Sequence, residues 1–418
     1  MPNIASFNRA QRGRRPHRLA DIEFSSAFQP IFSPTHQRLV GYEALMRGRY
    51  DEQPVSPPEV FKLAEKADAV ASLDRQLQSL HLRQFARHAP STWLFLNITP
   101  TTCVQPAQAM AHLDRVCQSQ GLHPEQVVLE VVETATDDQA RLLDFIHLAR
   151  ERGFQIAIDD FGIGDSNFER VWQLEPLIIK IDRSLLVNAE SHLRARQLLN
   201  GLVSMIRESG SLVLIEGIET PAQARIALAT EADLLQGFLF GRPEVLGKPR
   251  NAPELDFSRH LASYRQHSQR NSDQHGDYLR QLRASLLDAC HGLSHGGDLA
   301  EACGRLLAQD GVQRCFLLDQ AGIQQGGLAS KNHVRRDVYF NPLYQSSGAC
   351  WSHRDYFRQA LEHPHRINVC RPYVALPDAI RTVTLSACIS RGGGTQVFCV
   401  DIHPDALFDG QLAFPDSL

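Results

Sequence analysis

The chain has 418 residues, of which 43% are hydrophobic and 22% are charged, and its formal net charge is -4 at pH 7. This composition excludes a wholly disordered chain, and the lack of excess positive charge argues against a protein that coats duplex DNA. Because one hydrophobic core rarely grows beyond about 250 to 300 residues, the length predicts two domains.

Residues 1–20 are rich in arginine and predict a flexible basic tail rather than a secretory signal, since no apolar run follows them. A nucleic-acid or membrane arm is the alternative. No later stretch reaches the roughly 18 to 20 consecutive apolar residues that span a membrane. The nine cysteines are scattered and form no CxxC pair, which is typical of reduced thiols. We therefore expect a soluble, cytoplasmic protein.

Residues 21–250 alternate short apolar runs with longer helix-patterned stretches. This alternation predicts βα units around a parallel sheet, and runs without polar alternation predict strands buried on both faces. Both a barrel and a doubly wound sheet fit this pattern. The runs are WLFLNITP, QVVLEVVET, FQIAIDDFG, LIIKIDRS, SLVLIEGIET and DLLQGFLF.

A polar residue ends each of these runs, and the spacing between consecutive ones suits a strand, a helix and their turns. In a TIM barrel such residues converge on one mouth, whereas a Rossmann sheet carries a GxGxxG turn that this region lacks. The pattern favours the barrel. The residues are Asn97, Glu130, Asp159, Lys180, Glu216 and Gln236.

Residues 251–298 are polar at first and read as a connector that contains a helix. Leu279, Leu286 and Leu293 recur every seven residues, which fits either a short dimeric coiled coil or an amphipathic helix packed on its own domain. Residues 299–418 predict a small α+β domain. Within it, 383–389 alternate as a half-buried antiparallel strand, followed by a glycine turn at 392–394.

Seven oxygen-bearing side chains of the first domain would meet at the barrel mouth. Five carboxylates cannot share a small volume in ionised form unless cations neutralise them, and oxygen ligands select Mg²⁺ or Mn²⁺. Two such ions form the usual clamp for in-line attack of water on a phosphodiester, and Lys180 could hold that water. Ordinary solvated carboxylates are the alternative for any one position. The seven are Glu43, Asn97, Glu130, Asp159, Asp160, Glu216 and Gln236.

From Phe28 to Pro243 the sequence resembles the EAL-domain phosphodiesterases, which hydrolyse the bacterial messenger cyclic di-GMP to linear pGpG. The resemblance rests on FQPIF, YEALMR, LFLNITP, LEVVET, AIDDFGIGDS, IKIDRS, IEGIET and LLQGFLFGRP. It implies a modified TIM (β/α)8 barrel, a homodimer and two Mg²⁺ or Mn²⁺ ions, with Ca²⁺ supporting binding without turnover.

The resemblance also implies roles for individual residues. The seven oxygen-bearing residues match the metal-ligand positions. Lys180 matches the lysine that assists the attacking water, and Glu133 matches a glutamate that holds the loop after Asp160. Three positions match contacts to the dinucleotide and two match supporting positions. The dinucleotide contacts are Gln29, Leu45 and Arg47, and the supporting positions are Asp182 and Glu219.

The loop after Asp160 departs from the family pattern at Ile163, Asp165 and Asn167, and the segment before Lys180 departs at Leu177. Retained ligands predict an enzyme. The altered loop leaves open a catalytically weak or inactive cyclic di-GMP receptor that signals through a partner protein. A barrel that binds no nucleotide and serves as an interaction protein is a third reading.

The C-terminal domain looks like the PAS-like or Cache-like sensor domains that are often joined to signalling enzymes. We expect it to modulate the barrel in response to a small molecule or a protein partner. The candidate pocket residues are Trp351, Arg354, Tyr356, Tyr373 and Asp401. The alternative is that these residues are structural members of the core.

Overall fold

The computed structural model describes residues 18–88, 91–132, 139–162, 168–247, 257–330, 347–375 and 380–408. The chain divides into two compact units, Met1–Tyr264 and Arg265–Leu418. No helix in these described ranges is long and apolar enough to cross a membrane. Glu133, Ile163, Asp165 and Asn167 lie outside the described residues.

Eight strands of the first unit close into a barrel, which confirms the predicted fold. Strand β1 pairs with both β9 and β2, so the sheet has no open edge between them, and β3 (Gln53–Val55) extends β2. The barrel strands are β1 (Glu23–Ser33), β2 (Arg38–Tyr50), β4 (Trp93–Ile98), β5 (Val127–Val132), β6 (Gln155–Phe161), β7 (Ile178–Ile181), β8 (Leu212–Ile215) and β9 (Leu234–Gln236).

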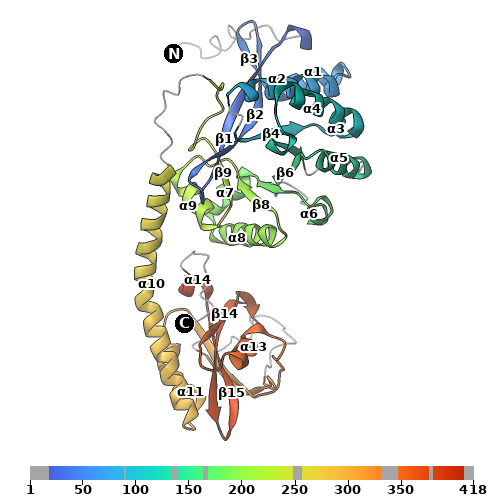
Figure 1. Ribbon diagram of the computed structural model, residues 1–418. Coiled ribbons are helices and arrows are strands. Elements are labelled where there is room, and N and C mark those ends of the chain that lie inside the picture. The colour runs from blue at the N-terminus through green and yellow to red at the C-terminus, as the bar shows by residue number, and fades with distance from the viewer. Residues whose placement is uncertain are drawn as a thin grey trace, which may run out of the picture. The chain divides into compact units, whose positions relative to one another are not determined.

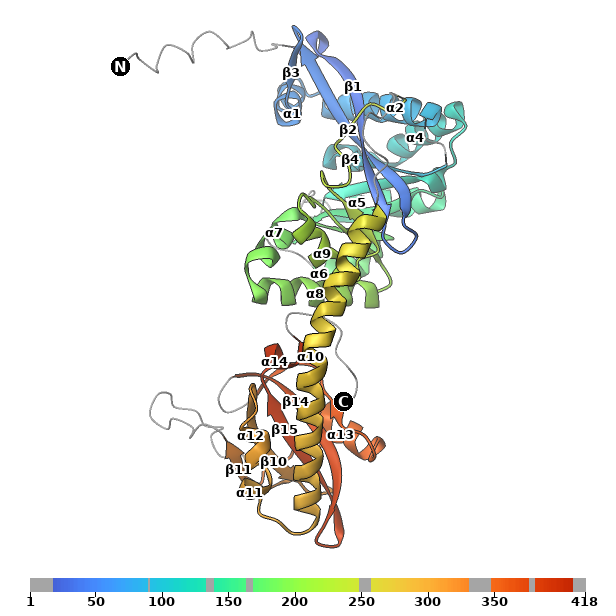
Figure 2. The same cartoon turned by 90° about the vertical axis from the view of Figure 1, so that its left-hand side faces the viewer.

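The barrel is a modified one because β1 runs antiparallel to both of its neighbours, while the successive pairs from β2 and β4 round to β9 are parallel. Strands β1 and β2 are the longest strands of the barrel, and they continue past its other strands as a two-stranded ribbon (Figures 1 and 2). This ribbon carries residues on β2 beyond the rim of the barrel.

Helices cover the outside of the barrel (Figure 1). Helix α5 shows the usual reason: Leu142, Phe145, Ile146 and Ala149 recur on one face and are buried, and Gly153 ends the turn that follows at a φ of 90°. The helices are α1 (Pro57–Lys66), α2 (Val70–His88), α3 (Pro100–Cys103), α4 (Pro106–Gln120), α5 (Gln139–Glu151), α6 (Phe168–Leu174), α7 (Arg183–Ser191), α8 (Leu193–Glu208) and α9 (Pro221–Ala229), with short 3-10 turns at Leu19–Asp21 and Pro124–Gln126.

Apolar side chains fill the inside of the barrel in one continuous layer. A second, larger cluster lies between the strands and the helices. Both faces of each strand are therefore buried, which explains why the runs in the sequence carry almost no polar alternation. The inner layer consists of Ile31, Phe95, Val128, Ala157, Ile178, Leu214 and Leu234.

The second unit is an antiparallel sheet in the order β11-β10-β15-β14-β12, with β13 paired to β14. Its strands are β10 (Val312–Leu318), β11 (Gln324–Ser330), β12 (Asn368–Val369), β13 (Tyr373–Ala375), β14 (Ile380–Arg391) and β15 (Gly394–Ile402). The glycine turn is confirmed: Gly392 and Gly393 both have positive φ between β14 and β15. Its helices are α11 (Leu299–Ala302), α12 (Gly304–Leu307), α13 (Asp355–Glu362) and α14 (Pro404–Phe408).

Helix α10 (Phe257–Ser294) occupies most of the predicted connector. Its side chains Leu282, Leu286, Ala289 and Leu293 are buried in the same cluster as the strands of the second unit. The heptad-like leucines are thus those of an amphipathic helix packed on its own domain, rather than a coiled-coil seam.

The prediction that β14 is half-buried is wrong. Val383 and Leu385 face the apolar cluster, but Thr384 and Ser386 on the other face are also completely buried. Helix α13 covers that second face, where the Ser386 hydroxyl donates to the carbonyl oxygen of Tyr356 at 2.6 Å. The polar residues that alternate along β14 therefore face a hydrogen-bonded interface with α13 instead of solvent.

Candidate active site

The polar residues at the barrel mouth follow the inner apolar layer at a spacing of two. Val128 precedes Glu130 by two residues on β5, and Ile178 stands in the same relation to Lys180 on β7. Since side chains alternate along a strand, both members of each pair point into the barrel, and the later one lies nearer its C-terminal end. The same spacing holds for Asn97, Asp159, Glu216 and Gln236, which therefore converge.

The ammonium group of Lys180 lies at the centre of this convergence. Its Nζ is 2.5 Å from Oε1 of Glu130, 2.6 Å from Oε1 of Glu216 and 2.9 Å from Oδ1 of Asp159. Oε1 of Glu43 lies farther away, at 3.9 Å. Lys180 is only 1% exposed and Glu130 is fully buried. Four carboxylates from β2, β5, β6 and the end of β8 thus surround one buried cation.

This crowding shifts the protonation of the cluster. Burial raises the pKa of Glu130 well above its ordinary value, against the opposing charge of Lys180. Burial, with the negative charges of Asp159 and Glu43, raises the pKa of Glu216 to about 8. Burial tends to lower the pKa of Lys180, but the surrounding carboxylates outweigh it and the pKa rises well above its ordinary value. The lysine therefore stays charged, while Glu130 and Glu216 accept protons more readily than ordinary glutamates.

Two amides anchor Glu43 from either side. Nδ2 of Asn97 donates to Oε1 of Glu43 at 3.1 Å, and Nε2 of Gln236 donates to Oε2 at 2.7 Å. Gln29 is the register partner of Glu43 on β1, and its Nε2 lies 3.4 Å from the carbonyl oxygen of Gly241. The predicted residues of β1, β2, β4 and β9 are thereby brought to one place.

Asp160 departs from regular strand geometry. Its φ is 56°, which is uncommon for a residue other than glycine, and the register of β6 shifts between Ile158 and Phe161. Burial and the neighbouring charge of Asp159 raise the pKa of Asp160. This bulge lets two consecutive aspartates lie at the same strand end, where strained backbone is characteristic of functional sites.

The other predicted contacts lie at the rim rather than in the cluster. Leu45 is half-buried and Arg47 exposed on β2, where they follow Glu43 with the spacing of one strand face. Asp182 accepts a hydrogen bond from the backbone N–H of Ser184 at 2.7 Å and so caps α7. Glu219 is paired with Arg183 at 2.8 Å. These residues therefore lie around the barrel mouth, outside the carboxylate cluster.

The donor set suits a hard divalent cation. Among the described residues, Oε2 of Glu130 and Oε1 of Gln236 have no hydrogen-bond partner although both are buried. In the same part of the chain, no three acidic, imidazole or thiol side chains already have the spacing of a metal site, because the carboxylates close on Lys180 instead. Unpartnered oxygens beside a cation-neutralised carboxylate cluster fit the chemistry of Mg²⁺ or Mn²⁺.

Sequence reasoning missed Asp74, which is 3% exposed on α2. Its Oδ2 accepts hydrogen bonds from the hydroxyl of Thr102 at 2.6 Å and from the hydroxyl and backbone N–H of Thr99 at 3.0 and 3.2 Å. These bonds fix the turn that begins two residues after Asn97. No local signal distinguishes this aspartate from an exposed residue of a helix, since its partners are 25 or more residues away in sequence.

The five candidate residues of the C-terminal unit form one connected group. The guanidinium of Arg354 lies 5.2 Å from the ring of Tyr373 and 6.0 Å from that of Trp351, and Tyr373 stacks on Tyr356 at 6.1 Å. The Tyr373 hydroxyl is 2.7 Å from that of Thr384, which in turn donates to Asp401 at 2.6 Å. Arg314 pairs with the other oxygen of Asp401 at 2.5 Å.

A family model described as the EAL domain matches residues 12–243. Cyclic di-GMP phosphodiesterase NbdA of Pseudomonas aeruginosa is 29% identical over 241 residues, which cover 54% of this chain and 29% of NbdA. Probable cyclic di-GMP phosphodiesterase PdeD of Escherichia coli is 29% identical over 254 residues, which cover 58% of this chain and 44% of PdeD. The chain spans less than half the length of each of these relatives.

One solved structure is similar to nearly the whole chain. The Bacillus subtilis YkuI protein, which has an EAL domain and was crystallised with cyclic di-GMP and calcium, superposes with a TM-score of 0.75. The similarity covers 92% of this chain and 97% of that one at 20% sequence identity. At this identity the likeness concerns the fold, and it includes both units.

Proposed function

Since the chain belongs to the EAL-domain family, we propose that its barrel is a phosphodiesterase that hydrolyses cyclic di-GMP to linear pGpG. The observation that carries this proposal is the buried cluster of four carboxylates and two amides around Lys180. Such a concentration of oxygen ligands is suited to a phosphodiester and to the divalent ions that accompany it.

Two Mg²⁺ or Mn²⁺ ions would supply an activated water and a counter-charge for the phosphate oxygens when bound by the seven oxygen-bearing residues. Lys180 orients a nucleophilic water and offsets negative charge at the reacting phosphorus, because its charge is retained in the buried cluster. Arg47, exposed at the rim, pairs with a phosphate of the dinucleotide, while Gln29 and Leu45 line its site. Asp182 and Glu219 support the rim through α7 and Arg183.

The first test incubates the full chain with cyclic di-GMP and Mg²⁺ or Mn²⁺ and separates the nucleotides by chromatography. We expect pGpG to form, and Glu43→Ala to abolish it. The matched control is Glu151→Ala, which removes an exposed glutamate at the end of α5 that pairs with His147. Unchanged substrate with both metals contradicts the phosphodiesterase and favours the receptor reading.

Calcium separates the two remaining readings. A receptor binds cyclic di-GMP in the presence of Ca²⁺ without hydrolysing it, and the same is expected of an active enzyme. An interaction protein with an unused site binds none. Equilibrium dialysis with Ca²⁺, run beside the Mg²⁺ reaction, therefore assigns the chain to one of the three classes.

We propose that the chain forms a homodimer through the face of the barrel that carries α6 and α8. Trp172 on α6 is 66% exposed, and Leu198 and Met205, seven residues apart on α8, are 75% and 43% exposed. Exposed large apolar side chains on one side of a protein are suited to an interface with a partner. Light scattering on Leu198→Lys should report a lower mass than on the unaltered chain, and an unchanged dimer excludes this face.

The C-terminal unit is proposed to modulate the barrel by binding a small molecule. Tyr356 is 2% exposed, and within the described chain neither its hydroxyl nor Nε of Arg354 has a hydrogen-bond partner. Two donors without acceptors are suited to a ligand carboxylate. Deleting residues 270–418 should change the hydrolysis rate or the oligomeric state, and no change in either removes the modulatory role.

A further inference from the structure

A second pocket lies at the end of the barrel opposite to the carboxylate cluster. It has a volume of about 620 Å³, and its lining comes from the β1–β2 turn and from residues at or just before the starts of β2, β4, β5, β8 and β9. This volume is within the usual range of pockets that hold small molecules, about 300 to 1,000 Å³. The strands carry the catalytic residues at their other ends, so the two sites are distinct.

The pocket exists because the barrel interior is not filled down to this end. Below the inner apolar layer, the next inward positions are two residues earlier on each strand, and on β4 and β8 these are Trp93 and Leu212. On β2 the position level with the apolar layer is Gly41, where an added Cβ would lie 3.0 Å from the Phe95 ring. The inner apolar layer is tightly packed and closes the pocket on the side facing the carboxylate cluster. The space on the other side of this layer stays open and forms the pocket.

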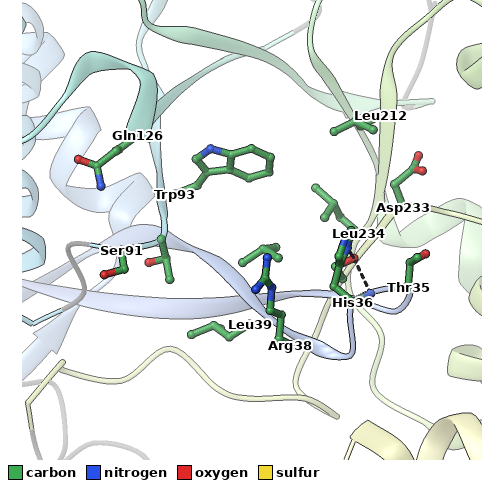
Figure 3. A pocket seen from close by; sticks show the side chains of 13 residues that line it. Thr35, His36, Arg38, Leu39, Ser91, Trp93, Gln126, Leu212, Asp233 and Leu234 are labelled. Atoms are coloured by element: carbon green, nitrogen blue, oxygen red, sulfur yellow. Dashed lines mark hydrogen bonds between the residues drawn. The ribbon is translucent and has the colours of Figure 1, made fainter.

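Two recognition groups lie across this space. Figure 3 shows the guanidinium of Arg38 reaching from β2 toward the indole ring of Trp93 on β4. Arg38 is exposed, and no ion pair or hydrogen bond of its guanidinium is found among the described residues. The contact recorded for the Trp93 ring is an edge-to-face one with Phe95 at 6.4 Å. A guanidinium with no ionic partner among the described residues, opposite a half-buried indole, is suited to a planar anion.

The opposite wall adds an acceptor. Oδ2 of Asp233 accepts the backbone N–H of Val213 at 2.9 Å, and its Oδ1 lies 3.9 Å from Nε of Arg207. In Figure 3 this carboxylate points away from Arg38. A negative charge on that side of a ligand would be repelled, whereas an N–H or O–H group would be accepted there. The pocket is therefore polarised, with its positive end at Arg38.

We propose that this pocket binds a small aromatic anion, with the ring against Trp93, the anionic group at Arg38 and a ring donor toward Asp233. The class includes nucleoside monophosphates and aromatic carboxylates, which share a planar ring, one anionic end and a donor group. The proposal does not depend on the phosphodiesterase activity, because none of the three residues belongs to the catalytic mouth.

Isothermal titration calorimetry on the full chain tests this with four probes. GMP and 4-hydroxybenzoate each carry a ring, an anion and a donor, and they distinguish a phosphate from a carboxylate. Guanosine lacks the anion and ribose 5-phosphate lacks the aromatic ring. We expect at least one aromatic anion to bind at least tenfold more tightly than either partial ligand. Equal or absent binding of all four probes overturns the proposal.

Paired variants locate the site. Arg38→Gln should weaken binding of the aromatic anion at least tenfold, and Trp93→Leu should weaken it by a similar factor, with far-UV circular dichroism confirming that both variants fold. Arg47→Gln alters the catalytic mouth and should leave the affinity unchanged. If Arg47→Gln weakens binding while Arg38→Gln does not, the probe occupies the catalytic mouth and the second pocket is not a binding site.

Discussion

Replacing Lys180 by methionine is the sharpest test of the barrel mouth, because it removes the cation and keeps the side-chain volume. The ammonium lies 2.5 to 2.9 Å from three carboxylates. Lys180→Met therefore leaves Glu130, Glu216 and Asp159 facing one another in a buried space without compensation. We expect this variant to be strongly destabilised when no divalent cation is present.

The expected magnitude follows from two opposing contributions. The Coulomb attraction between the ammonium and the three nearby carboxylates favours the folded state. The desolvation of a buried ammonium opposes this by several kcal/mol, and protonation of the carboxylates relieves part of the loss. Breaking a buried ion pair typically costs about 3 to 5 kcal/mol. For a barrel of this size that corresponds to a decrease in Tm of about 6 to 20 °C.

The dependence on pH has a definite sign. In the folded chain the pKa of Glu216 is raised to about 8, and the pKa of Glu130 is raised well above its ordinary value. A carboxyl group with a raised pKa in the folded state favours folding at low pH and disfavours it as the pH rises through that pKa. Removing the lysine raises these pKa values further, so the deficit of Lys180→Met should grow from pH 5 to pH 8.

Differential scanning fluorimetry in EDTA, repeated with Ca²⁺ at each pH, measures these effects. Ca²⁺ should restore more of the Tm of Lys180→Met than it adds to the unaltered chain, because a cation can then reach the vacated oxygens. Lys62→Met, on α1, is the matched control for loss of a lysine. Equal Tm values for Lys180→Met and the unaltered chain in EDTA at pH 8 would refute the assignment of Lys180 as the charge that holds the cluster together.

Three further predictions concern packing and protonation elsewhere. Burial lowers the pKa of His81 to about 4. The neutral ring therefore contributes about 3 kcal/mol to the free energy of unfolding above pH 6.5, and this contribution is lost as the pH falls toward 4. Urea titrations should show that the stability of His81→Gln depends less on acid. An added Cβ at Gly237 would lie 2.1 Å from a backbone oxygen, so Gly237→Ala should lose about 3 kcal/mol in the same titration, whereas Gly201→Ala on α8, with open space around it, should gain up to about 1 kcal/mol. Arg314→Met removes the cation that pairs with the fully buried Asp401, and hydrogen exchange of β14 and β15 should show a loss of about 3 to 5 kcal/mol, with normal protection as the contrary result.

The barrel mouth could be predicted from the sequence because its information is local. On each strand an apolar residue is followed two positions later by a polar one, as in Phe95 and Asn97 or Leu214 and Glu216. A period of two requires both to face the interior, and parallel strands bring their C-terminal ends together. The pattern therefore specified which residues meet.

The remaining features depend on contacts between segments that lie far apart in sequence. Asp74 is buried by threonines that follow β4, and Thr384 by Asp401 and Tyr373. The same limit applies to Lys180, whose role as the centre of the cluster appears only when four strands are placed around it. A polar residue in a helix or strand gives no sign of its distant partner.

The two ends of the barrel are joined by the same strands but separated by a packed layer. Strand β4 carries Trp93 at one end and Asn97 four residues later at the other, which is about 13 Å along an extended strand. Phe95 is fully buried between them, within the inner apolar layer. A ligand in the lower pocket would reach the carboxylate cluster through the strands themselves, by favouring one arrangement of them over another. Close packing of the inner layer makes such rearrangement costly, so we expect the pocket to act on the stability of the barrel more than on its rate of hydrolysis.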